Sequence, residues 1–129
     1  MDDAERRLLV EQHYAAAARS EMDGVHTIYH DDAVIEYPQS EERILGRQKL
    51  RGLRESYPAT LDFSIRRIVG SGDLWVTEYV INYDGKPVNT ISIMEFDGDA
   101  VARETLYFAD PFDAPEWRSE WVEVGLRRE

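Results

Sequence analysis

The sequence predicts a single α+β domain in which three helices come first and a curved, mainly antiparallel sheet follows. Three observations predict it. Apolar residues have helical spacing near the N-terminus, a short strand then ends at Pro38 before Gly46 opens another helix, and four alternating segments fill the stretch from Leu61 to Ala109. Helices followed by a curved sheet predict a cone-shaped domain that encloses a pocket.

The helices are predicted from apolar spacing and from their end signals. The first is expected over residues 3–21, with Asp2 and Asp3 as plausible N-caps whose charges also suit the helix dipole. Asp23-Gly24 breaks it, and a short second helix is expected over 25–30. The third is expected over 47–57, with Leu50, Leu53 and Tyr57 on one face and Pro58 as its stop.

The strands are predicted from alternation and from turn residues. The first covers 33–37 and ends at Pro38, because proline cannot donate to a ladder, and a polar loop covers 39–44. Four more strands are expected at 61–69, 74–83, 88–96 and 100–109, separated by turns such as Asp84-Gly85. These connections are too short for helical crossovers, so a parallel sheet is not expected.

The composition fits one domain of 129 residues with a C-terminal tail at 113–129. Hydrophobic residues make up 43% and charged residues 32%, and the net charge of −11 argues against general nucleic-acid binding. The basic residues between Arg43 and Arg67, Arg54 among them, are interpreted as a solvated helix face. The tail carries Trp117 and Trp121, which suggests that it packs onto something.

The chain has no cysteine, which excludes disulfides and thiolate metal sites and fits a reducing cytoplasm. The first ten residues lack a signal-peptide core, and no apolar run approaches the roughly 20 residues that cross a membrane. His26 and His30 are four apart, as a two-histidine metal site needs, but they flank a turn beside Asp31 and Asp32. We therefore expect a cytoplasmic protein without metal, cofactor, membrane or nucleic-acid partner.

Several segments resemble a known superfamily. Asp23-Gly24, the stretch IYHDDAVIEYP at 28–38 and Gly46-Arg47 look like the start of the nuclear-transport-factor-two-like fold, in its SnoaL-like and ketosteroid-isomerase-like branches. Later turns around Tyr83 to Gly85 and Glu95 to Gly98 fit the same pattern. The likeness covers about residues 5–112.

The resemblance implies a cone-shaped barrel, a cystatin-like roll, and a homodimer formed through the convex sheet face. Alternation on the 74–83 strand puts Trp75 and Tyr79 on one face and Val76 and Glu78 on the other. The expected pocket takes an apolar or aromatic small molecule. Its predicted lining residues are Tyr14, Tyr37, Leu53, Trp75, Tyr79, Ile81, Leu106, Phe108 and Phe112, with Gln39 at the mouth.

Most of the isomerase machinery that the resemblance implies is missing. The family's base lies just before the strand-ending proline, where this chain has Tyr37; Glu36 should point to the opposite face. The oxyanion aspartate falls near Ser92, and the oxyanion tyrosine at His13 or Tyr14. The carboxylate base and the protonated aspartate that ketosteroid isomerases use have no counterparts at these positions.

SnoaL-like cyclases resemble the chain at a different place. Their key aspartate lies near the end of the last strand, six residues after an acid, and Glu104 and Asp110 have that spacing. As an enzyme, the chain would use Asp110 as acid or base, Glu104 as its partner, and Tyr14 or Tyr37 as donor to a substrate oxygen. Alternatively, Asp110-Pro111 is an ordinary terminating turn and Glu104 pairs with an arginine.

Three functions remain open on the sequence. The pocket catalyses metal-free acid–base chemistry such as cyclisation, isomerisation or hydration on a ring-containing substrate. Alternatively, it holds a ligand without turnover, or the protein is chiefly a dimeric interaction module. The fold is shared by enzymes and binding proteins and does not separate these.

Overall fold

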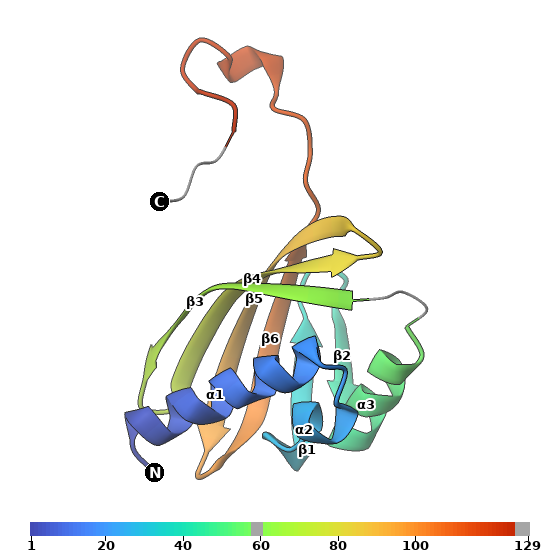
Figure 1. Cartoon of the computed structure of the whole chain (residues 1–129), viewed down its shortest axis with the longest axis vertical. Coiled ribbons are helices and arrows are strands. Elements are labelled where there is room, and N and C mark those ends of the chain that lie inside the picture. Colours follow the sequence, from blue (N-terminus) through green and yellow to red (C-terminus); the bar gives the residue numbers. More distant parts are fainter. Residues whose placement is uncertain (58–60, 126–129) are drawn as a thin grey trace.

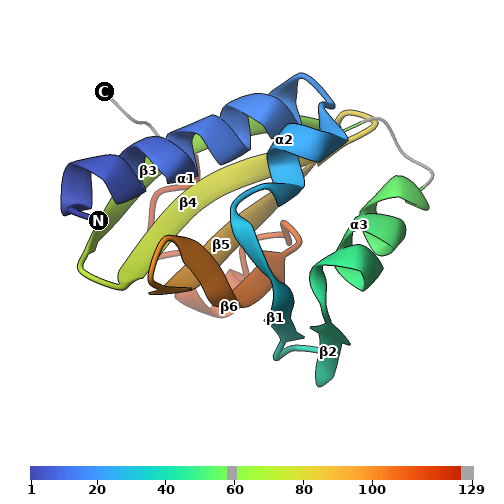
Figure 2. The same ribbon diagram turned by 90° about the horizontal axis from the view of Figure 1, so that it is seen from below.

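In the computed structural model, which describes residues 1–57 and 61–125, three helices pack on one face of a curved six-stranded sheet that does not close. Figures 1 and 2 show α1 and α3 on this concave side. The helices are α1 (Asp3–Ala18), α2 (Met22–His26) and α3 (Arg47–Glu55). The predicted α+β architecture is confirmed.

The sheet has the order β2-β1-β6-β5-β4-β3. The strands are β1 (Tyr29–Tyr37), β2 (Glu42–Leu45), β3 (Leu61–Ser71), β4 (Leu74–Tyr83), β5 (Lys86–Asp97) and β6 (Ala100–Ala109). A 3-10 turn, η1 (Glu116–Arg118), follows in the tail. Since β3 to β6 form a meander of hairpins, most of the sheet follows from local turns.

One sequence prediction about the sheet was wrong, and one strand pair was not predicted. The expected polar loop at 39–44 contains the start of β2, which pairs antiparallel with β1 and buries Ile44. In addition, β1 pairs with β6 in parallel, because the long connection through β2, α3 and the meander brings the chain back beside its first strand. The sheet is still mainly antiparallel, as expected.

Helix boundaries differ from the prediction by a few residues. The second helix lies earlier than expected and ends at His26, so that Tyr29 and His30 already belong to β1. The third ends at Glu55, two residues early, and the predicted stop Pro58 lies outside the described residues. The β4 and β6 limits agree with the prediction.

The start of α1 is tied to the sheet by side-chain contacts. The Asp2 carboxylate caps the helix by accepting a bond from the Glu5 backbone N–H at 2.8 Å. Arg6 is 8% exposed and donates to the Gly72 and Gly98 carbonyls, each at 2.7 Å. These two carbonyls belong to neighbouring hairpin turns, so Arg6 fixes the helix across the β3–β4 and β5–β6 turns.

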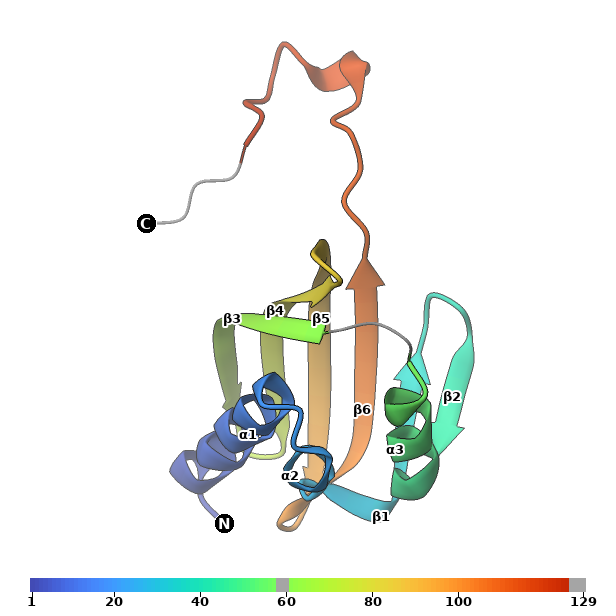
Figure 3. The ribbon, with the colours of Figure 1, turned by 45° about the vertical axis from the view of Figure 1, so that its right-hand side comes forward.

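The core lies between the helices and the concave face. On β4, Trp75, Thr77, Tyr79 and Ile81 are buried and alternate with partly exposed residues, as predicted. Leu50 anchors α3 with no exposed surface. Figure 3 shows α1 and α3 on either side of the concave face of β5 and β6. Residues of both helices line a cavity there.

The tail beyond β6 projects away from the domain (Figures 1 and 3). Phe112, Trp117 and Trp121 are 78–80% exposed, so the expected packing partner of this segment does not lie within the described part of the chain. No helix of the described residues has the length and apolar character of a membrane span.

Candidate functional site

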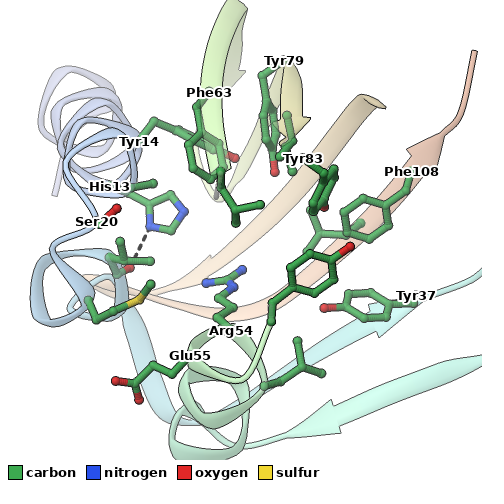
Figure 4. A pocket seen from close by; sticks show the side chains of 18 residues that line it. His13, Tyr14, Ser20, Tyr37, Arg54, Glu55, Phe63, Tyr79, Tyr83 and Phe108 are labelled. Carbon is green, nitrogen blue, oxygen red and sulfur yellow. Dashed lines mark hydrogen bonds between the residues drawn. The ribbon is translucent and has the colours of Figure 1, made fainter. Parts of the chain in front are cut away.

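A cavity of about 420 Å³ opens between α1, the end of α3 and the concave face of the sheet (Figure 4). Most of the predicted lining residues are found there: Tyr14, Tyr37, Leu53, Tyr79, Ile81, Leu106 and Phe108. Further aromatic lining comes from Tyr57, Phe63 and Tyr83. The walls are therefore mainly aromatic and aliphatic, which suits a ring-containing molecule.

The aromatic rings contact one another along the walls. Tyr37 and Phe108 meet edge to face with centroids 5.4 Å apart, and Tyr57 and Tyr83 lie 5.1 Å apart. Burial, followed by the nearby Tyr57, raises the pKa of Tyr83 to about 12, so its hydroxyl stays protonated at neutral pH. These tyrosines offer hydroxyl donors without a charge.

Five of the predicted ligand or catalytic residues do not line the cavity, and the first four are Trp75, Gln39, Phe112 and Asp110. Trp75 is buried but donates its indole N–H to the Gly72 carbonyl at 3.0 Å. Gln39 makes two bonds to the Phe108 backbone, at 2.7 and 2.6 Å, and so fastens the 38–41 turn to β6. Phe112 is 79% exposed in the tail, and Asp110 is exposed just beyond the end of β6.

Glu104 is buried beneath the cavity and is not among its lining residues. It is 1% exposed and accepts bonds at 2.5 Å from the Tyr29 hydroxyl and from the Ser92 hydroxyl. Its predicted partner Asp110 does not contact it in any described hydrogen bond; its counter-charge is Arg54, whose Nη2 lies 3.6 Å from Oε1. The structure therefore agrees with the alternative prediction from the sequence, in which Glu104 pairs with an arginine.

Arg54 is the functional residue that the sequence interpretation missed. Instead of facing solvent with the other basic residues, it turns from α3 into the cavity, where its guanidinium lies among the lining side chains (Figure 4). The side chain is 22% exposed. Its position in the helix could have indicated this orientation. Arg54 is four residues after the fully buried Leu50, and residues i and i+4 lie on the same helix face.

Neighbours hold the Arg54 guanidinium in place. Nη2 donates to the Tyr29 hydroxyl at 3.2 Å, and Nη1 contacts His26 Nε2 at 3.3 Å. Burial lowers the pKa of Arg54, but Tyr29 and Glu104 together raise it by more than burial lowers it. The net direction is upward, so the guanidinium stays positively charged. Burial likewise lowers the pKa of His26, which is therefore neutral at neutral pH.

His13 is a second nitrogen-containing polar side chain, besides Arg54, that lines the same cavity. Its Nδ1 lies 2.7 Å from the Val25 carbonyl, and because a carbonyl only accepts, Nδ1 carries the hydrogen and Nε2 a lone pair. Burial, followed by the charge of Arg54, lowers the pKa of His13 to about 3. The imidazole is thus a neutral acceptor, and it faces the cavity beside Arg54 (Figure 4).

Tyr14 has a buried hydroxyl without a hydrogen-bond partner among the described residues. The hydroxyls of Tyr79, Thr77 and Ser92 lie close enough to lower its pKa, yet none has hydrogen-bonding geometry. Burial dominates and raises the pKa of Tyr14 above its ordinary value. Tyr14 lines the cavity, and its hydroxyl is buried.

The two histidines considered for a metal site lie on different elements. His26 is buried at the end of α2, while His30 on β1 contacts the Asp97 carbonyl at 2.7 Å. Among the described residues no group of three or more potential ligands gathers for a metal.

The family model described as "SnoaL-like domain" matches residues 10–104, which is well over half of the sequence. The chain therefore belongs to the SnoaL-like domain family, and the resemblance inferred from its motifs is confirmed.

Solved structures agree with this assignment. An NTF-2 like protein of unknown function from Burkholderia xenovorans LB400 is 49% identical, with a TM-score of 0.86 and coverage of 97% of this chain and 99% of that one. A putative ketosteroid isomerase from Kribbella flavida is 20% identical, with a TM-score of 0.89 and coverage of 98% and 95%. An LEH-like epoxide hydrolase from M. tuberculosis is 23% identical, with a TM-score of 0.67 and coverage of 81% and 83%. The last two show the fold alone, and no curated protein matched the chain.

Proposed function

We propose that this protein binds an apolar, ring-containing small molecule in the cavity between α1, α3 and the sheet. The observation that carries the proposal is the aromatic lining of a cavity of about 420 Å³, a volume within the range of small-molecule sites. The cavity spans both helices and the concave face, so a ligand there would contact most of the domain.

Binding without turnover is favoured over acid–base catalysis by the positions of the carboxylates. Glu104 is enclosed by Tyr29 and Ser92, and Asp110 lies outside the lining. Glu55 is the carboxylate among the described lining residues, and it points away from Arg54 (Figure 4). A general base must reach the proton that it removes, and none of these three is placed to do so in this arrangement.

We also propose that two copies associate through the convex face of the sheet. Ladder neighbours Val69, Val76 and Ile93 form an apolar row across β3, β4 and β5 on the face away from the helices. Ile91 and Tyr107, which are ladder partners, are each 40% exposed on the same face. An exposed apolar patch of this kind is typical of an interface.

Occupancy of the cavity is tested with naphthalene as the probe. Freshly purified protein is first examined by native mass spectrometry for a co-purifying molecule, then titrated with naphthalene while amide resonances are recorded by NMR. We expect shifts that cluster at lining residues such as Phe63, Tyr79 and Leu106.

A pair of variants, one of which fills the cavity with a larger side chain, provides the control. Ala17 lines the cavity from α1, whereas Ala15 on the same helix is exposed, so Ala17→Phe should abolish the shifts and Ala15→Phe should leave them unchanged. Equal shifts in both variants, or shifts scattered over the surface, would contradict binding in this cavity.

A further inference from the structure

Arg54 and His13 form a polar pair in a cavity lined mainly by aromatic and aliphatic side chains. Arg54 has five N–H groups, and the described hydrogen bonds occupy two of them, to His26 and to Tyr29. Both acceptors are neutral, and within the described part of the chain the guanidinium reaches no carboxylate at hydrogen-bonding distance. N–H groups therefore remain for a molecule in the cavity that Arg54 lines.

His13 supplies the complementary function. Its N–H is committed to the Val25 carbonyl, so only the Nε2 lone pair is left to face the cavity. The pair thus presents donors from α3 and one acceptor from α1. A ligand that satisfies both must offer an acceptor to Arg54 and a donor to His13.

Charge decides which kind of ligand this is. The positive charge of Arg54 is balanced by Glu104, 1% exposed and 3.6 Å away, so the group as a whole is neutral. A carboxylate in the cavity would gain Arg54 but would add a second buried negative charge near Glu104 and would meet the lone pair of His13. Desolvating that extra charge is costly, while a neutral molecule avoids the cost.

We infer that the cavity selects a neutral ring compound carrying a carbonyl oxygen next to an N–H or O–H donor, such as a carboxamide or an enolised dicarbonyl. The carbonyl oxygen accepts from Arg54, the neighbouring donor binds His13 Nε2, and the ring lies among the aromatic walls. Glu104 and Tyr29 hold Arg54 in position. This inference rests on the proposed function, because it specifies the polar end of the same ligand.

The test compares four probes with one ring system: naphthalene, methyl 2-naphthoate, 2-naphthoate and naphthalene-2-carboxamide. Dissociation constants are measured by NMR titration at pH 7 on the full chain. We expect the carboxamide to bind most tightly, about tenfold better than naphthalene, because it alone makes both hydrogen bonds. The ester should lie between them and the naphthoate should bind more weakly than the carboxamide.

Two variants assign the preference to its residues. Because Arg54→Met alone leaves Glu104 buried and unpaired, the double variant Arg54→Met with Glu104→Gln is used, and it should reduce carboxamide affinity to that of naphthalene. His13→Phe should remove the advantage of the carboxamide over the ester. Folding of each variant is confirmed by its amide spectrum before titration.

The outcomes separate the inference from the function on which it rests. Equal affinity of all four probes, or tightest binding of the naphthoate, would overturn the inference while leaving the proposed apolar cavity intact. Failure of every probe, naphthalene included, would overturn both. A carboxamide preference that survives the double variant would also overturn the role given to Arg54.

Discussion

Acid should destabilise the folded protein through His13, because the buried imidazole resists protonation. The side chain is 5% exposed, and burial lowers its pKa from 6.5 to about 3. Between these two pH values the unfolded chain binds a proton that the folded chain does not, so stability falls as pH falls below 6.5. From pH 8 to pH 5 the loss attributable to His13 is about 2 kcal/mol.

The assay is urea unfolding at pH 8 and pH 5 for the wild type and for His13→Gln. Replacing the histidine removes this titration, so the pH-dependent loss in the variant should be smaller by about 2 kcal/mol, whatever the variant's stability at pH 8. His30→Gln, which removes the histidine of β1 near the surface, is the matched control. An equal pH-dependent loss in wild type and His13→Gln would refute a neutral, buried His13.

Three further predictions concern other parts of the molecule. Glu104→Gln should lower the free energy of urea unfolding by about 3 kcal/mol, because it leaves Arg54 buried without its counter-charge. Glu36→Gln, which breaks a surface ion pair with Arg103, should lower it by about 1 kcal/mol or less. Similar losses in the two variants would contradict the buried pair. Gly52→Ala should raise the free energy of unfolding by about 0.5–1 kcal/mol, because alanine favours the helix and its methyl group meets open space in α3. Gly70→Ala should lower the free energy of unfolding by about 1–3 kcal/mol, because the methyl group would clash with the Leu74 carbonyl oxygen. Light scattering should show a dimer for the wild type and the 15.0 kDa monomer for Ile91→Asp; a wild-type monomer at high micromolar concentration would contradict the convex interface.

Alternation and turn residues were sufficient to predict most of the sheet. On β4, the burial of Trp75 and Tyr79 follows from period-two alternation and from the Asp84-Gly85 hairpin signal, both of which are local. The same reasoning missed β2, whose four residues include the charged Glu42 and Arg43, because an edge strand of this length carries little alternation to detect. The parallel β1–β6 pair was also beyond local reasoning, since its partners are separated by most of the chain.

The sequence predicted many of the site residues that lie on strands, but it did not predict Arg54, which enters the cavity from the end of α3. Alternation puts Leu106 and Phe108 on one face of the last strand, the resemblance implies that this face borders a pocket, and both residues line the cavity. The same alternation placed Glu104 on that side correctly, but it could not show that Tyr29 and Ser92 enclose the carboxylate. Asp110 failed to follow the pattern into the cavity because β6 ends at Ala109.

The buried network of Arg54, Glu104 and Tyr29 bears directly on whether the cavity is merely part of the core. It joins α3, β6 and β1, and it keeps two opposite charges beneath aromatic walls. Apolar residues of similar volume often give equal or greater stability at such a place, because removing two charges from water is costly. Stability alone therefore does not account for an arginine directed into the cavity with unused N–H groups, whereas a ligand with a matching acceptor does.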